Sequence, residues 1–272
     1  MHQVVAIQGE EGSNSSVAAR ELLGAQVQLL YCASFSEAFS ALDGRATSAV
    51  LPFENTTAGP VQEVWDFLMG LDPCAPQVSA LAEVRVPITF VAAGLKSTEQ
   101  VQRILAHPVA AAQCRKYLRR VGWEVLPCHD TAGAARLVRE RGDFSIAALC
   151  PPAAAQHYHL NVFDVCGDAA QTLTRFVSVV SGPAQLSPTD KHCVLSLKLL
   201  DQPGALARAL TSFATRSLNL SALHSRAEPG SPGIYRFLLE LDAGAGDPRC
   251  EDALAEVRAS GAQTRVLGSW AR

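Results

Sequence analysis

Residues 48–59 read SAVLPFENTTAG, an apolar run that passes directly into a polar cluster. Open α/β sheets bind ligands at the carboxyl ends of their strands, where loops on a rigid scaffold carry functional side chains. Within four residues the cluster offers the carboxylate of Glu54, the amide of Asn55 and the hydroxyls of Thr56 and Thr57. The pattern predicts the rim of a ligand site. Taken alone, the pattern slightly favours two threonines that cap a following helix over residues 61–69.

Apolar runs alternate with amphipathic segments on both sides of this stretch. Before it, strands are expected over 4–7 and 46–51, with helices over 15–23 and 36–42 between them, and this rhythm predicts a largely parallel sheet. After it, Pro87 places the expected strand 83–92 at an edge or a bulge. Further elements are predicted as helices over 99–105, 108–121 and 131–141, and as strands over 123–126, 146–149 and 175–180.

Residues 181–190 are polar and rich in glycine and proline, which marks a domain boundary. Beyond it the expected elements follow the order βαββαβ, the ferredoxin-like arrangement. We therefore expect an α/β protein with a first domain over 1–182 and a second over 191–272. The first domain is predicted to form two lobes that share a cleft, one from about 1–75 and 160–182 and the other from about 76–159.

Composition narrows the class of protein. The 272 residues carry a net charge of −3, which gives no basic surface for nucleic acid. No apolar run reaches membrane-spanning length and no signal peptide is recognisable, so a cytoplasmic protein without a membrane partner is expected. The eight cysteines form no Cys-x-x-Cys pair and indicate buried free thiols rather than metal ligands. Gly9 and Gly12 are too few for a dinucleotide fingerprint, and no cofactor is expected.

Several segments, in the same order along the chain, resemble the prephenate dehydratase family. Residues 51–67 are similar to its Pro-Ile-Glu-Asn-Ser segment with the Gly-x-Val helix start, and 174–176 match its Thr-Arg-Phe triplet. Residues 6–12 resemble its opening strand and turn, and 107–114 resemble its His-Pro helix. Further resemblances lie in the family's C-terminal ACT domain, at 204–206, 225–226 and 266–270. The resemblance covers essentially the whole chain.

The resemblance implies an enzyme that converts prephenate to phenylpyruvate and is inhibited by phenylalanine bound between ACT domains of a homodimer or homotetramer. It also implies a two-lobed catalytic domain like that of periplasmic binding proteins. The residues that it assigns to catalysis are Thr174, Asn55, Gln113 and Glu54, and to substrate binding Arg175, Thr56, Ser15 and Phe176. The assigned effector-binding residues are Gly204, Ala205, Leu206, Asn219, Leu220, Ser225 and Arg226.

The chemistry of prephenate fits these residue types. Loss of water and carbon dioxide yields an aromatic ring, so the enzyme must supply a cation for a carboxylate, a donor for the leaving oxygen and dry walls. Arg175 is suited to bind a carboxylate through two N–H groups. The resemblance places Thr174 at the leaving hydroxyl. Glu54 would repel a dianion unless it is protonated or paired, so a structural role stays open for it.

Each of these residues also has a simpler interpretation. Residues 174–176 also fit an ordinary strand with an exposed threonine and arginine beside a buried phenylalanine. Gln113 would then be a solvent-facing helix residue, and His107 before Pro108 is better read as a helix cap than as an acid or base.

The chain departs from the family pattern at several positions of the cleft and of the effector motif. Asn14 replaces tyrosine, Ala106 replaces serine and Thr172 replaces asparagine, which leaves arogenate open as an alternative substrate. His224 replaces the glutamate of the Glu-Ser-Arg-Pro effector motif, which leaves open the strength and pH response of phenylalanine feedback. A non-catalytic amino-acid-binding regulator is the alternative from another class. A periplasmic solute-binding protein is disfavoured by the missing export signal.

Overall fold

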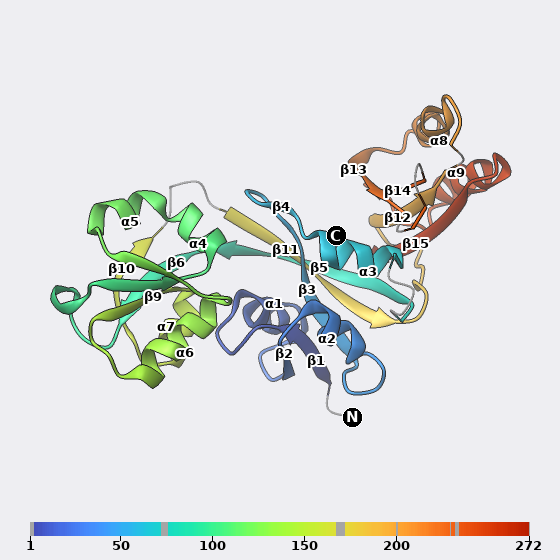
Figure 1. Ribbon diagram of the computed structural model, residues 1–272. Helices are drawn as coiled ribbons and strands as arrows, with labels where there is room; N and C mark the ends of the chain where they lie inside the picture. The colour runs from blue at the N-terminus through green and yellow to red at the C-terminus, as the bar shows by residue number, and fades with distance from the viewer. Residues whose placement is uncertain are drawn as a thin grey trace. The chain divides into compact units, whose positions relative to one another are not determined.

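The computed structural model describes residues 3–71, 76–166, 172–199, 201–228, 230–231 and 234–271 (Figure 1). It confirms the expected α/β class. The chain divides into two compact units, one of Met1–Val61 with Val84–Phe176 and one of Gln62–Glu83 with Val177–Arg272. Strands β5 (Val78–Ile88) and β11 (Thr172–Ser181) therefore contribute residues to both units.

The first unit contains a parallel sheet centred on β1 (Val4–Gln8). Strand β1 pairs in parallel with β2 (Gln28–Cys32) and β3 (Ser48–Asn55), as the β-α-β rhythm predicts. Helices α1 (Asn14–Leu23) and α2 (Phe35–Ser40) connect these strands. The short β4 (Gly59–Pro60) folds back on the end of β3, and β11 lies on the other side of β3 from β1. The core of this layer includes the fully buried Val5, Ile7 and Val50.

A second sheet of the same unit has the order β10-β6-β9-β7-β8. Its strands are β6 (Phe90–Gly94), β7 (Arg103–Ala106), β8 (Glu124–Pro127), β9 (Ile146–Cys150) and β10 (Asn161–Cys166). Strand β7 runs parallel to β8 and β9, whereas β6 is antiparallel to β9 and β10. Its helices are α4 (Pro108–Gln113), α5 (Arg115–Val121), α6 (Thr131–Arg141) and α7 (Pro152–His157).

The structure differs from the sequence predictions in several places here. The helix predicted over 99–105 is wrong, because only a short 3-10 turn, Thr98–Gln100, precedes β7. Strand β7 is hydrogen-bonded on both sides and Ile104 is fully buried, so sheet pairing outweighs local helix preference. The helix predicted over 108–121 breaks at Cys114 into α4 and α5. The sequence predicts that the chain returns to the first lobe at about residue 160. In the structure, β10 still pairs with β6 of the second sheet, so the return comes after Cys166.

The second unit contains the expected βαββαβ order. Strands β12 (His192–Lys198), β13 (Leu220–Ala227), β14 (Tyr235–Leu241) and β15 (Gln263–Trp270) form a sheet in the order β13-β14-β12-β15. Helices α8 (Ala205–Ala214) and α9 (Pro248–Ala259) pack on it over a core that includes Leu195, Leu197 and Phe213. The ferredoxin-like prediction is confirmed.

Residues 62–83 group with this C-terminal sheet, although the sequence places 62–75 in the first lobe. Helix α3 (Gln62–Met69) buries Trp65 and Met69 in this unit, and β15 pairs with β5 at Gly268 and Ala80. Part of the burial of α3 comes from β13, since the ring of Trp65 lies 4.4 Å from that of His224. Whether residues 1–182 form a domain of their own stays a prediction.

A partly buried ion pair between Arg20 of α1 and Glu11 in the turn before this helix predicts an acid-dependent contribution to stability. Arg20 donates to both carboxylate oxygens of Glu11, at 2.7 and 2.8 Å, and this pairing lowers the pKa of Glu11 to about 2. Because the folded pKa lies below the ordinary value of 4.5, the contribution is complete above that pH and is lost as the pH falls toward 2. Glu11→Gln should cost about 1 kcal/mol near neutral pH, since partly exposed pairs are screened.

Urea denaturation at a series of pH values measures this contribution. The difference between wild type and Glu11→Gln should shrink steadily below pH 4. Glu21→Gln, an exposed glutamate on the same helix, is the control and should differ little from wild type at any pH. A Glu11→Gln difference that does not change with pH would contradict the assignment.

Candidate active site

The side chain of Asn55 orients the hydroxyl of Thr174. Its Nδ2 donates to Thr174 Oγ1 at 2.8 Å, while its Oδ1 accepts from the backbone N–H groups of Thr57 at 2.9 Å and Ala58 at 2.8 Å. Two backbone donors therefore fix which end of the amide faces the threonine. Since Thr174 Oγ1 accepts from Asn55, its own proton is available to another acceptor. Thr174 is only 6% exposed, so this donor lies in a largely dry environment.

The turn between β3 and β4 is tied to the start of β11. Thr56 donates its backbone N–H to the carbonyl of Leu173 at 2.9 Å, and its Oγ1 accepts from the N–H of Leu173 at 3.0 Å. The hydroxyls of Thr57 and Thr172 lie 3.0 Å apart. Both threonines of the predicted cap thus bind β11, and the described hydrogen bonds include none from their side chains to the start of α3. This double attachment fixes Asn55 beside Thr174.

A second pair joins the same two strands one residue earlier on β3 and one residue later on β11. Arg175 Nη1 donates to Glu54 Oε2 at 3.0 Å, and its guanidinium lies 5.2 Å from the ring centre of Phe53. Thr174 and Arg175 thus take different partners on β3, Asn55 and Glu54 respectively. Arg175 is 13% and Glu54 33% exposed. The ion pair supports the structural role left open for Glu54.

The other predicted site residues take varied positions. Ser15 is buried in the first turn of α1, and Gln113 is half-buried at the end of α4. The described hydrogen bonds include none between Gln113 and either Asn55 or Thr174. Phe176 is 2% exposed within the core that contains Val5 and Val50, which is a packing position. The roles of Ser15, Gln113, Phe176 and Thr56 toward substrate stay predictions.

His107 acts as the expected helix cap, because its side chain accepts from the N–H of Val109 at 3.3 Å. Asp130 likewise caps α6 through the N–H of Gly133, as the sequence predicts. Burial raises the pKa of Asp130, and its Oδ2 lies 3.4 Å from the place where a Cβ on Gly9 would stand. The end of β1 therefore comes close to the second sheet.

The turn from Gly9 to Gly12 joins the two sheets of the first unit. Glu10 Oε2 accepts from Arg136 Nε at 2.8 Å and from the Tyr158 hydroxyl at 3.3 Å. A Cβ on Gly12 would stand 2.5 Å from the Cα of Ala154, so this position admits no side chain without a shift of backbone. Sequence reasoning missed the Glu10 contacts, although the Gly-x-x-Gly turn at the end of the first strand marks the place.

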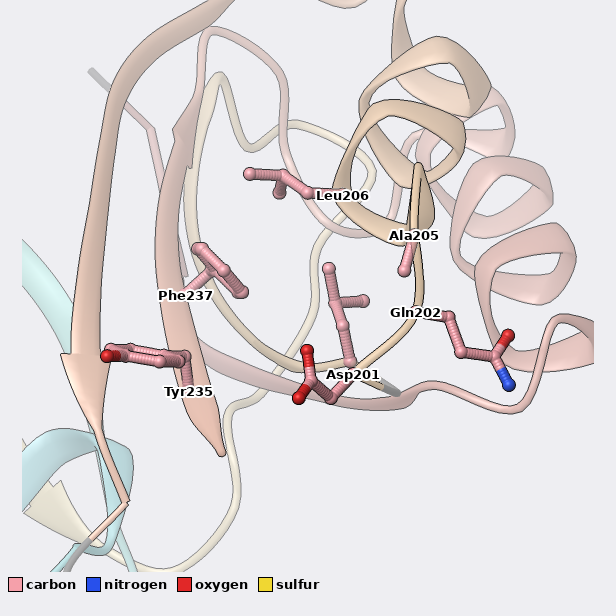
Figure 2. A pocket seen from close by; sticks show the side chains of 7 residues that line it. Asp201, Gln202, Ala205, Leu206, Tyr235 and Phe237 are labelled. Atoms are coloured by element: carbon pink, nitrogen blue, oxygen red, sulfur yellow. The ribbon is translucent and has the colours of Figure 1, made fainter. Parts of the chain in front are cut away.

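The C-terminal unit contains a second site, a cavity of about 180 Å³ (Figure 2). Residues from the start of α8, from the turn before it and from β14 line this C-terminal pocket: Leu199, Asp201, Gln202, Ala205, Leu206, Tyr235 and Phe237. Figure 2 shows the Asp201 carboxylate between the aromatic rings of β14 and the start of α8. Gly204, with φ +76°, stands immediately before that helix. The predicted Ala205 and Leu206 line the pocket.

Other predicted effector residues lie on or next to β13 and are not among the residues that line the C-terminal pocket. Asn219 donates to Asp242 at 2.6 Å, and Arg226 binds Asp66 on α3. Asp201, Tyr235 and Phe237 line the pocket without having been predicted from the sequence, although Asp201 lies just before the glycine motif. The binding roles of Gly204, Asn219, Leu220, Ser225 and Arg226 stay predictions.

The described part of the chain holds neither a metal-ligand cluster nor a membrane-spanning helix. In the ranges given above, no group of three or more histidine, cysteine, aspartate or glutamate side chains could hold a metal ion. Among the same residues, no helix has the length and apolar character needed to cross a membrane.

These features define a class: α/β proteins with a buried threonine–asparagine site and a C-terminal ferredoxin-like domain that carries a pocket of its own. The chain belongs to the prephenate dehydratase family, whose profile matches residues 5–183. It is 32% identical over 275 residues to the prephenate dehydratase of Amycolatopsis methanolica, covering 98% of this chain and 88% of that protein.

Solved structures agree over nearly the full length. The prephenate dehydratase of Arthrobacter aurescens in complex with L-Phe has a TM-score of 0.87 and 31% identity, and the match covers 99% of this chain and 90% of that one. The quorum quenching acylase GqqA has a TM-score of 0.88 and 30% identity, with 99% and 98% covered.

Proposed function

We propose that this chain is a prephenate dehydratase, a carbon–oxygen lyase that forms phenylpyruvate, carbon dioxide and water from prephenate. The observation that carries the proposal is the hydrogen bond from Asn55 to Thr174, because it leaves the threonine proton available to a leaving oxygen. A regulator without activity would not need this orientation of a buried hydroxyl. Family membership supports the same conclusion.

The reaction needs one proton and no oxidant. The ring carboxylate leaves as carbon dioxide, and its C–C bonding electrons enter the ring while the C–O bond at the opposite carbon breaks. The departing hydroxide takes up a proton and becomes water. Thr174 donates a hydrogen bond to that oxygen as negative charge builds on it, and Asn55 stabilises the threonine oxygen in turn. Such a donor in a dry site lowers the barrier by about 3 kcal/mol.

The charges around the threonine suit an anionic substrate. Arg175 neutralises Glu54, so this carboxylate does not add its full repulsion against a dianion. Asn55 and Thr174 are uncharged donors, which orient carboxylates without a fixed negative charge. Direct binding of a substrate carboxylate by Arg175, and substrate contacts from Gln113 and Ser15, are parts of this proposal.

The C-terminal pocket, which we call the effector pocket in this proposal, supports regulation by phenylalanine. Its apolar wall of Phe237, Leu199 and Leu206 suits an aromatic side chain, and Asp201 suits an ammonium group. We assign it to L-phenylalanine, the ligand of the Arthrobacter aurescens relative. A homodimer or homotetramer, with the effector between C-terminal domains, is part of the same proposal. The cytoplasmic location expected from the sequence stays a prediction.

An assay with two substrates tests the function. Purified protein is mixed with prephenate and with arogenate, and phenylpyruvate and phenylalanine respectively are measured. Rapid phenylpyruvate formation that added phenylalanine suppresses is expected. Turnover of arogenate alone, or of neither compound, would refute the proposal. Since one similar protein is a quorum quenching acylase, an acyl-homoserine lactone is a useful third substrate and should not be cleaved at a comparable rate.

A further inference from the structure

Two residues of β13 are held by two adjacent residues of α3. Arg226 donates through Nε to Asp66 Oδ1 at 2.7 Å and through Nη2 to Asp66 Oδ2, a two-pronged ion pair. The rings of His224 and Trp65 meet edge to face with centroids 4.4 Å apart. Trp65 is 1% exposed, and the side chains of Arg226 and Asp66 are 29% and 31% exposed. The helix and strand are thus joined by packing and by charge-assisted hydrogen bonds.

The C-terminal end of α3 is anchored to the same sheet. Arg236 of β14 donates through Nη1 to the carbonyl of Met69 at 3.0 Å, which satisfies one of the free carbonyls at a helix end. Arg236 is itself held by Glu228, whose pKa falls to about 2 because of hydrogen bonds from Arg236 and Lys198. A movement of β13 and β14 would therefore move α3.

The effector pocket is lined by Tyr235 and Phe237 of β14, the strand that pairs with β13. In the register of β13 with β14, Phe237 lies opposite Ser225, Arg226 opposite Arg236, and Tyr235 opposite Ala227. The two pocket aromatics thus flank, across the strand pair, the arginine that binds Asp66. A ligand that displaces Tyr235 or Phe237 acts directly on the backbone ladder beside Arg226.

The other end of α3 leads to the candidate active site along the chain. Only Val61 separates α3 from β4, and the N–H of Val61 donates to the carbonyl of Phe53 at 3.0 Å. Strand β4 pairs Gly59 with Asn55, the residue that orients Thr174. One short segment therefore carries the Asp66 contact at one end and the Asn55 turn at the other.

We propose that Asp66, Arg226, Trp65 and His224 transmit the effector signal, so that phenylalanine in the effector pocket alters the Asn55 turn through α3. Arg226 and His224 are positioning residues in this scheme and do not contact the effector. The inference rests on the proposed function. It gives the Ser225–Arg226 part of the effector motif the role of coupling the effector pocket to the Asn55 turn, in place of a role in binding the effector.

Asp66→Asn tests this separation of binding from response. Calorimetry should give a phenylalanine dissociation constant within about threefold of wild type. Without phenylalanine, kcat and KM for prephenate should also stay within about threefold of wild type. The residual rate at saturating phenylalanine should rise at least about fivefold, the lower range of allosteric couplings. Glu63→Gln, an exposed acid on the same helix, is the matched control and should be inhibited like wild type.

Further variants separate the possible failures. Arg226→Lys keeps the charge but loses the two-pronged geometry, and it should weaken inhibition less than Asp66→Asn. The double variant Asp66→Arg with Arg226→Asp should recover part of the inhibition. Undiminished inhibition in folded Asp66→Asn, or loss of phenylalanine binding in it, would overturn the inference.

A readout without turnover keeps the inference distinct from the proposed function. Phenylalanine should change the fluorescence of Trp65 in wild type, identified by comparison with Trp65→Phe, and should leave it unchanged in Asp66→Asn. A wild-type protein that shows this change but does not convert prephenate would refute the proposed function alone. Equal fluorescence changes in both proteins would refute the transmission path alone.

Discussion

Thr174→Ala should lower kcat for prephenate about 10²–10³-fold, the usual effect of removing one donor that stabilises developing negative charge. KM should change much less, because the hydrogen bond strengthens only as the C–O bond breaks. The loss also leaves Asn55 Nδ2 without its acceptor at 2.8 Å, which adds a small cost to folding. Steady-state kinetics with prephenate, together with a thermal melt, measure both effects.

Two variants on the same strand serve as comparisons. Thr174→Ser keeps a hydroxyl at the same place and should retain most of the rate. Ser178→Ala removes another buried hydroxyl of β11 and should leave kcat unchanged. A Thr174→Ala enzyme with wild-type kcat would show that the leaving oxygen receives its hydrogen bond from another group.

Asn55→Asp should lower kcat by a similar factor while the fold is retained. An aspartate has nearly the same shape and keeps the two acceptor bonds from the N–H groups of Thr57 and Ala58. Its second oxygen, however, accepts where the amide of Asn55 donates, so the Thr174 proton turns toward the carboxylate and away from substrate. The new charge also repels the substrate dianion, so KM should rise as well.

Asn55→Ala is the informative companion to Asn55→Asp. It removes the amide that donates to Thr174 but does not put an acceptor in its place, so it should retain a higher kcat than the aspartate variant. It should destabilise the β3–β4 turn more, because the bonds from the N–H groups of Thr57 and Ala58 are lost. Kinetics on both variants, with thermal melts as the control for folding, provide the comparison. If Asn55→Asp were as active as wild type, the direction of the Asn55–Thr174 hydrogen bond would have no part in catalysis.

Much of the fold follows from local patterns in the sequence. Glycine and capping residues mark α6 at Asp130 and Gly142, and the β-α-β rhythm predicts the parallel pairing of β1 with its neighbours. The helix expected over 99–105 failed because β7 is defined by partners on both sides, which are distant in the sequence. Local preference cannot report such long-range pairing.

The residues of the candidate site could be predicted from the sequence, but the contacts between them could not, because these contacts also join distant parts of the chain. The sequence shows the polar cluster at the end of β3 and the Thr-Arg-Phe triplet, because both consist of neighbouring residues. It does not show that Asn55 pairs with Thr174, because 119 positions separate the two residues. The direction of the amide depends on two backbone N–H groups in a turn whose geometry the sequence does not specify. Asp66 offered no signal, because a single acid on an amphipathic helix is usually solvated.

The packing of α3 against the C-terminal sheet has a consequence for truncation of the protein. A fragment that ends at residue 182 would retain α3 but lose β13 and β14, and would present the indole of Trp65, 1% exposed in the intact chain, to water. Exposed apolar patches of this kind cause self-association. Such a fragment should elute as soluble aggregates in size-exclusion chromatography, and replacing Trp65 with a polar residue should reduce them. A monodisperse, folded fragment would show that the N-terminal part is self-sufficient.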